Sequence, residues 1–300
     1  MQTIELVEVR KSYDSFVAVN NLTLNIEEGT VFGLLGPNGA GKTSTIRMMI
    51  GITAPDTGEI RMFGKPFERT SLQRVGYLPE ERGLYKRMKI LDQLVFLGEL
   101  HGMAQDNARR QAIRWCERLE IAEKLHSKVE ELSKGMQQKI QFIAALMHDP
   151  DFVIMDEPFF GLDPVNATLL KDVLLEIKKQ GKTILFSTHR MDQVEKLCDS
   201  ICLINRGTPV LQGPLKQVKA QYGKRNVQIE YEGSGDFLHQ TQLVGSYNNY
   251  GNYVEVRLAA GADPQQLLRT AAEQSRISKF ELVEPSLEEI FIEVVGKNDA

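Results

Sequence analysis

This sequence of 300 residues contains no long hydrophobic run. A helix that crosses a bilayer needs roughly 20 consecutive apolar residues, so we expect that the chain does not span a membrane by itself. Residues Met1 to Val9 include Glu5 and Glu8 and have no sustained apolar core, which predicts that they are not a signal peptide. Any action at a membrane would therefore need a partner.

Cysteine is scarce as well: the chain has Cys116, Cys198 and Cys202. Their number is odd and their spacing is not that of metal ligands, so we interpret them as reduced, packed thiols of a cytosolic protein. A formal net charge of −4 gives no general attraction to nucleic acid, and no nucleic-acid partner is expected. Repeats and low-complexity tracts are also missing, and the length favours about two domains.

The most informative segment that is present is rich in glycine and follows an apolar, strand-like run, Val31 to Leu35. It matches the pattern G-x-x-x-x-G-K-[ST] and leads into a helix-like stretch, Ser44 to Ile50. A strand before and a helix after are the context in which this pattern binds the phosphates of a nucleoside triphosphate. The residues predicted to bind the nucleotide here are Gly36, Pro37, Asn38, Gly39, Ala40, Gly41, Lys42, Thr43 and Ser44.

The chemistry of phosphate explains these residue types. Glycines let backbone N–H groups approach phosphate oxygens, and the following helix directs its positive N-terminal end at the same point. Lys42 is placed to reach the β- and γ-phosphates, and the Thr43 hydroxyl is placed to bind Mg²⁺. The segment therefore predicts a site for a nucleoside triphosphate with Mg²⁺.

Two acidic residues, Asp156 and Glu157, follow an apolar run without alternation, Phe152 to Met155, which is typical of a central parallel strand. Ionised carboxylates at such a strand end are unfavourable unless something pairs with them. Asp156 fits the acidic residue that holds Mg²⁺ together with Thr43. Glu157 fits a general base that polarises the attacking water. The alternative is a solvated acid pair at a strand end.

Hydrophobic patterning predicts how the chain is organised. Strands are expected over residues 4–10 and 22–26, with Lys11, Ser12 and Tyr13 in an exposed turn. Helical periodicity over about 90–147 predicts a helical subdomain, and alternating strands and helices up to about 213 predict a parallel sheet with both faces covered. The first domain is expected to comprise residues 1–222.

The pattern changes after residue 222 and predicts a small α+β domain over residues 223–300. Strands are expected at 227–231, 253–258 and 277–283, and helices at 264–274 and 286–295. A turn-rich segment, 247–252, separates the first two strands. Ser286 is predicted to cap the last helix, with Glu289 at its third position.

Three further motifs accompany the phosphate loop and the acidic pair. They are Leu132-Ser-Lys-Gly-Met-Gln-Gln138, Gly161-Leu-Asp-Pro164 and Ser187-Thr-His189. In order and spacing, residues 3 to about 221 resemble the ATP-binding subunit of an ATP-binding-cassette (ABC) transporter. The resemblance implies an α/β fold: a P-loop ATPase core with an antiparallel β subdomain and a helical subdomain, followed here by the small α+β domain.

In this family two cassettes pair head to tail, with ATP between them. The resemblance implies that Ser133 and the helix beginning at Gly135 bind the γ-phosphate held by the other cassette. His189 would contact the γ-phosphate within its own cassette, and Asp163 would position the partner. Tyr13 would stack on adenine, whereas the residues alone favour an ordinary tyrosine at a strand end.

The sequence departs from the family pattern at three positions. Lys134 and Met136 replace the usual Gly and Gln of the signature; Lys134 either adds a positive charge near the phosphates or points to solvent. Glu80 stands where the family has a glutamine that binds Mg²⁺. A carboxylate still ligates Mg²⁺, but it adds negative charge and donates no hydrogen bond.

Residues Tyr77 to Tyr85 and Pro285 to Phe291 resemble an export branch that includes sodium-efflux-type ATPases and carries an extra C-terminal domain. This implies two partners: a second cassette, identical or not, and a separately encoded, ABC-2-like integral membrane permease. The chain would then lie on the cytoplasmic face of the membrane. Residues 80–89 are expected to contact the permease, although their basic residues are equally typical of a solvated face.

Two other classes explain the sequence less well. ABC-type ATPases of DNA maintenance carry very long coiled-coil inserts between phosphate loop and signature, and those of translation carry two cassettes. Here the interval from Thr43 to Leu132 is short and the chain has one cassette. A P-loop kinase would leave Ser133 and His189 unexplained.

Overall fold

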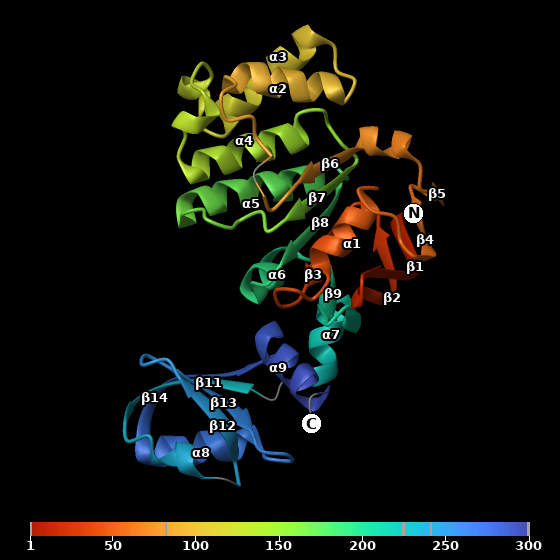
Figure 1. Cartoon of the computed structure of the whole chain (residues 1–300). Helices are drawn as coiled ribbons and strands as arrows, with labels where there is room; N and C mark the ends of the chain where they lie inside the picture. Colours follow the sequence, from red (N-terminus) through yellow and green to blue (C-terminus); the bar gives the residue numbers. More distant parts are fainter. Residues whose placement is uncertain (1, 82, 224–225, 241, 299–300) are drawn as a thin grey trace. The chain divides into compact units, whose positions relative to one another are not determined.

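The computed structural model describes residues 2–81, 83–223, 226–240 and 242–298. The chain forms two units, Met1–Pro214 and Leu215–Ala300 (Figure 1). The boundary expected after residue 222 falls at the end of helix α7 (Leu215–Tyr222), which belongs to the second unit. Arg82, within the motif from Tyr77 to Tyr85, lies outside the described residues.

A six-stranded sheet in the order β10-β9-β3-β8-β7-β6 forms the centre of the first unit. Its strands are β3 (Val31–Leu35), β6 (Val75–Leu78), β7 (Phe152–Asp156), β8 (Thr183–Thr188), β9 (Ser200–Asn205) and β10 (Thr208–Pro214). All neighbours run parallel except β10, which is antiparallel to β9. Every residue of β3, β7 and β8 is buried, as predicted for strands covered on both faces.

A second, antiparallel sheet has the order β2-β1-β4-β5. Its strands are β1 (Gln2–Tyr13), β2 (Phe16–Glu27), β4 (Thr57–Met62) and β5 (Lys65–Pro66). The turn expected at residues 11–13 was wrong, because these residues complete β1. Asp56 holds them in the ladder: it accepts from Ser12 N at 2.7 Å and from Lys11 Nζ at 2.8 Å.

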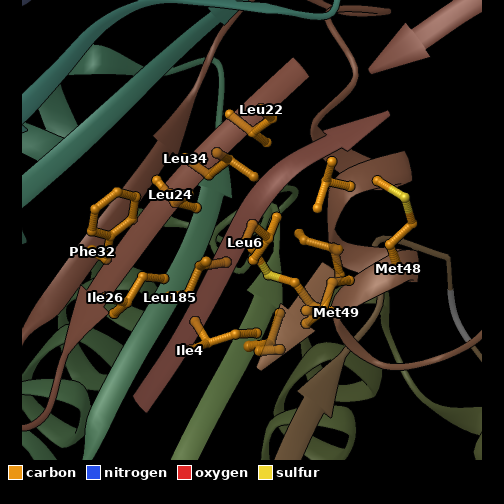
Figure 2. Close-up of a cluster of buried hydrophobic side chains, with 14 of the residues drawn as sticks. Ile4, Leu6, Leu22, Leu24, Ile26, Phe32, Leu34, Met48, Met49 and Leu185 are labelled. Carbon is orange, nitrogen blue, oxygen red and sulfur yellow. The ribbon is translucent and has the colours of Figure 1, made fainter. Parts of the chain in front are cut away.

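The two sheets of this unit share a hydrophobic core. Figure 2 shows side chains of β1 and β2, such as Leu6 and Leu24, beside Phe32 and Leu34 of the central sheet and Met49 of the first helix. All five are at most 3% exposed. This packing fixes the antiparallel hairpin next to the loop that follows β3.

Six α-helices and three 3₁₀ turns complete the described part of the first unit. They are α1 (Lys42–Met49), α2 (Ile90–Leu100), α3 (Gln105–Arg118), α4 (Lys134–Leu146), α5 (Pro164–Lys179), α6 (Met191–Leu197), η1 (Arg69–Arg74), η2 (Ala122–Lys124) and η3 (Val129–Glu131). Helices α2, α3 and α4 pack on one another at one end of the unit, which confirms the helical subdomain (Figure 1). Apolar residues of the predicted helical stretch, such as Leu94, Ala112 and Leu119, are buried there, whereas Leu100 is 66% exposed.

The second unit is a four-stranded antiparallel sheet with helices, in the order β12-β13-β11-β14. Besides α7 it contains β11 (Asn226–Gly233), η4 (Asp236–His239), β12 (Val244–Asn249), β13 (Val254–Leu258), α8 (Pro264–Gln274), β14 (Ser275–Val283) and α9 (Leu287–Asn298). The expected turn at 247–252 is partly wrong, because β12 includes Tyr247 to Asn249 and pairs with β13. The cap on α9 is confirmed: Glu289 N donates to Ser286 Oγ at 3.2 Å, and Ser286 N donates to Glu289 Oε2 at 2.9 Å.

Candidate nucleotide site

The phosphate loop joins the carboxyl end of β3 to the amino end of α1, as the pattern predicts. Two of its glycines lie against backbone from other strands. A Cβ at Gly36 would lie 2.2 Å from Ile204 O, and one at Gly41 would lie 2.3 Å from Ala18 O. Gly39 has φ +78°, and nothing lies within 4 Å of a Cβ there. Gly36 and Gly41 therefore let the loop pack on β9 and β2, whereas Gly39 supplies a left-handed residue beside open space.

Lys42 folds back over the loop. Its Nζ donates to Gly36 O at 2.8 Å and to Pro37 O at 3.1 Å, and the residue is 7% exposed. Burial lowers the pKa of Lys42, while the charges of Glu157, Asp156 and Glu80 oppose that shift. Phosphate oxygens accept from an ammonium more strongly than neutral carbonyls do. The loop therefore holds a cation that can exchange carbonyl partners for phosphate oxygens.

Thr43 and Asp156 lie in direct contact, although 113 residues separate them. Thr43 Oγ1 donates to Asp156 Oδ2 at 2.9 Å, and Ser187 Oγ donates to the other carboxylate oxygen. Asp156 is only 1% exposed, so these hydroxyls offset part of the unfavourable burial of its charge. Two of the three residues expected to bind Mg²⁺ are therefore side by side.

Glu157 is held in a strained backbone conformation. Its φ of +49° is unusual for a residue with a Cβ and costs roughly 1–2 kcal/mol. Its N–H donates to Ser187 O at 3.0 Å. The carboxylate accepts from Thr188 Oγ1 at 2.9 Å and from His189 N at 3.0 Å. These contacts hold the Glu157 side chain against the end of β8 and the residue that follows it.

The ring of His189 contacts the same carboxylate, with Nδ1 2.7 Å from Glu157 Oε1. An ionised carboxylate only accepts hydrogen bonds, so Nδ1 carries the proton. In a neutral ring Nε2 is then an acceptor, and only the protonated ring offers a second N–H to a phosphate oxygen. The His189 side chain is 43% exposed, which leaves it accessible to a ligand.

The loop and the acidic residues line one pocket of about 320 Å³. Its lining consists of Phe16, Ala18, Asn38, Gly39, Ala40, Gly41, Lys42, Thr43, Ser44, Glu80, Asp156 and Glu157. Burial raises the pKa of Glu80, and the charges of Asp156 and Glu157 raise it further. Three carboxylates thus face one ammonium. Such a pocket is suited to a divalent cation bound together with an anionic phosphate.

These residues fit Mg²⁺ better than a metal held by protein alone. Among the residues that the structure describes, no group of three or more His, Cys, Asp and Glu side chains is placed to hold a metal ion. Mg²⁺ is usually bound by one or two carboxylates together with substrate phosphates and water. Asp156, Thr43 and Glu80 are sufficient protein partners for that mode.

Phe16 lines the pocket, and sequence reasoning missed it. Phe16 and Tyr13 face each other across the β1–β2 turn and are 60% and 40% exposed. Tyr13, assigned to adenine by the resemblance, is not among the lining residues; the Lys11 ammonium lies 5.7 Å from its ring centroid. An exposed aromatic directly after a turn was the available signal. Phe16 is thus a second candidate for stacking on the base.

Replacing Phe16 with alanine is expected to weaken ATP binding about tenfold, because a stacked base loses roughly 1–3 kcal/mol when its aromatic partner is truncated. Tyr13→Ala is the matched variant, which should change the dissociation constant less than about twofold. Isothermal titration calorimetry with ATP and Mg²⁺ measures both. A larger loss for Tyr13→Ala would assign adenine to Tyr13 instead.

The remaining predicted residues lie outside the pocket lining. Ser133 is the N-cap of α4, where its Oγ accepts from Met136 N at 3.2 Å, and the helix begins at Lys134 instead of Gly135. Asp163 caps α5, and hydrogen bonds from Asn166 lower its pKa. Ser133, Lys134 and Asp163 are exposed, and Gly135 is half-buried. In one chain these residues are not brought to the phosphate loop.

A phosphate loop after β3 and an acidic pair at the end of β7, at the same edge of a parallel sheet, define a P-loop ATPase fold. The comparison with known proteins narrows this class. The family model described as "ABC transporter" matches residues 19–160, and the model for the "ATP-binding protein DrrA1-3-like, C-terminal domain" matches residues 213–295. The chain belongs to the ATP-binding subunits of ABC transporters.

Several relatives match over nearly the whole chain. It is 45% identical to the uncharacterised ABC transporter ATP-binding protein YhaQ of Bacillus subtilis (strain 168), over 99% of each chain. It is 33% identical to the Nod factor export ATP-binding protein I of Paraburkholderia xenovorans (strain LB400), over 98% of this chain and 97% of that protein. A solved ATP-binding subunit of an ABC transporter aligns with a TM-score of 0.69 and 28% identity, covering 74% of this chain and 93% of that one.

Proposed function

We propose that this chain hydrolyses ATP and that the hydrolysis drives export through a separately encoded membrane subunit. The observation that carries this proposal is that Lys42, Thr43, Asp156 and Glu157 line one pocket. These are the groups needed to bind a triphosphate, hold its metal ion and polarise a water molecule. Their convergence from two segments that are far apart in the sequence supports hydrolysis over nucleotide binding alone.

Five residues of the pocket, together with His189, have chemical roles in this proposal. Lys42 neutralises charge on the β- and γ-phosphates, and the N-terminus of α1 adds backbone N–H donors. Thr43, Asp156 and Glu80 would hold Mg²⁺ when the nucleotide is bound. Glu157 accepts a proton from the attacking water, and His189 orients the Glu157 carboxylate through the contact at Nδ1. Mg²⁺ supplies the electrostatic stabilisation of the transferring phosphoryl group.

The proposal also requires a second cassette. Ser133, Gly135 and Asp163 do not line the pocket of their own chain, and the first two stand at the amino end of α4. The first N–H groups of a helix lack intrahelical partners and attract anions. A second chain, placed head to tail, would close each pocket with the Ser133 end of its α4.

ATP is expected to drive dimerisation of the Glu157→Gln variant, in which bound ATP persists, and Ser133→Arg is expected to block it. A long side chain at residue 133 fills the space that the γ-phosphate of the partner would occupy. Sedimentation velocity with and without ATP measures the effect, at a protein concentration low enough that the chain is monomeric without ATP. Gln73→Arg, which adds the same residue at an exposed position of η1, should dimerise normally. ATP-independent monomers in the Glu157→Gln variant would contradict the proposal.

The partner in the membrane is proposed to be an ABC-2-like permease. None of the described helices has both the length and the apolar character that a membrane crossing requires. Tyr85, in the segment expected to contact the permease, packs edge to face on Phe96, with the ring centroids 6.0 Å apart. The two residues are 56% and 36% exposed. The DrrA-like C-terminal match and the Nod factor export relatives support export, with the chain peripheral on the cytoplasmic face.

A further inference from the structure

The second unit presents an uncharged edge strand. β12 is a terminal strand of its sheet, paired with β13 on one side. Only Val244 of this strand is buried; Gly245 to Asn249 are exposed. Residues 240–254 contain no Asp, Glu, Lys or Arg, in a chain that is 25% charged. Among the described residues, no strand pairs with the other side of β12. An edge strand with unpaired backbone groups and no charge is able to accept another strand.

The opposite edge of the same sheet is protected. β14 carries Arg276, Lys279 and Glu281 along its length, and charged side chains discourage pairing between edges. β12 has a register shift between Val244 and Ser246, which interrupts the strand only at its start. Pairing of Ser246 to Asn249 with β13 is regular. The β14 edge therefore carries charges that discourage strand pairing, whereas the β12 edge does not.

The turn that follows β12 is closed by contacts between its own residues. Tyr250 and Tyr253 stack with ring centroids 4.7 Å apart, and Tyr250 N donates to Tyr253 O at 2.9 Å. Asn249 Oδ1 accepts from Gly251 N at 2.9 Å, which fixes the same turn. A preorganised strand loses less conformational entropy when it pairs than a flexible segment does. The turn thus prepares β12 for association.

We propose that the β12 edges of two copies of this chain pair antiparallel, joining their second units into one continuous sheet. A strand that pairs with its own copy about a two-fold axis meets its own charges, so self-pairing favours an uncharged sequence such as residues 240–254. A two-fold contact occupies the β12 edges of both copies and leaves none free, so this contact does not extend into fibres. It needs no nucleotide and is separate from the ATP-driven contact between cassettes.

Sedimentation equilibrium of the full chain without nucleotide tests this contact. We expect a dimer, weakened at least about tenfold by the double substitution Ser246→Lys, Asn248→Lys, which places like charges across the joined edge. Gln266→Lys adds a lysine at an exposed position of α8 and should leave the dimer unchanged. Hydrogen exchange of wild-type β12 should slow as protein concentration rises.

Three outcomes would overturn the proposal. The chain without nucleotide could be a monomer at about 100 μM, or its dimer could be unaffected by the double lysine substitution. The third outcome is that the β12 amides are protected from exchange only when a membrane subunit is added. The last would assign the edge to a different partner. The test is independent of the proposed function. The Glu157→Gln chain that also carries the double lysine substitution should still dimerise with ATP through its cassettes. If that ATP-driven dimer does not form, the proposed function fails but the result for β12 stands.

Discussion

Replacing Glu157 with glutamine is expected to lower ATP turnover by about 10² to 10⁴ while ATP binding remains close to wild type. The amide keeps the size of the carboxylate but does not accept a proton from water. The phosphate loop and the ligands proposed for the metal are unchanged. A steady-state phosphate-release assay gives the turnover, and calorimetry gives the binding.

The structure explains why this variant should fold. A glutamine carbonyl still accepts from His189 N and from Nδ1, as Glu157 Oε1 does. Its NH₂ group faces Thr188 Oγ1, which already accepts from Arg190 N but has a second lone pair. The strain at φ +49° belongs to the backbone and is the same in both proteins. The loss should therefore appear in turnover and not in stability.

Glu273→Gln is the matched control, since Glu273 is an exposed residue of α8 in the second unit. It removes the same charge and should leave turnover unchanged. Near-normal hydrolysis by the Glu157→Gln protein would remove Glu157 from the role of general base. A large loss of ATP affinity would instead show that Glu157 acts mainly in binding.

Replacing Lys42 with alanine is expected to weaken ATP binding by about 10² to 10⁴. The ammonium would make two charge-assisted hydrogen bonds to phosphate oxygens, each contributing roughly 1.5–3 kcal/mol. In the free protein the same ammonium bonds to Gly36 O and Pro37 O, so the variant should also be slightly less stable. The stabilisation that ATP gives to the wild-type protein on heating should disappear.

Lys65→Ala is the matched control for Lys42→Ala, because it removes the same positive charge far from the phosphate loop in sequence. Lys65 is an exposed residue of β5, and its loss should change neither the melting temperature without ATP nor the shift that ATP produces. A Lys42→Ala protein that retains the full ATP-induced shift would contradict the role given to Lys42. The melting temperature without ATP distinguishes loss of binding from loss of the fold.

Local sequence was sufficient to predict which chemical groups the structure brings together in the pocket and most of the helices and strands that carry them. The phosphate loop, Asp156 and Glu157 were found because their motifs depend on neighbouring residues. Helix α8 spans Pro264–Gln274, the range that the sequence pattern predicted. These features are encoded within a few residues of one another.

Long-range contacts account for what local sequence did not show. Gly36 needs to be glycine because Ile204 O, 168 positions later, lies against it. Phe16 reaches the pocket because the β1–β2 hairpin packs beside the loop. Tyr247 to Asn249 have turn-forming neighbours, yet pairing with β13 makes them a strand. Each depends on a partner that is distant along the chain.

Equilibrium dialysis of labelled ATP with Mg²⁺ against the purified chain tests the central claim most directly. The account predicts saturable binding of one ATP per chain, lost in Lys42→Ala and dependent on Mg²⁺. Absence of saturable ATP binding by the folded wild-type chain, alone and with its membrane subunit, would contradict it.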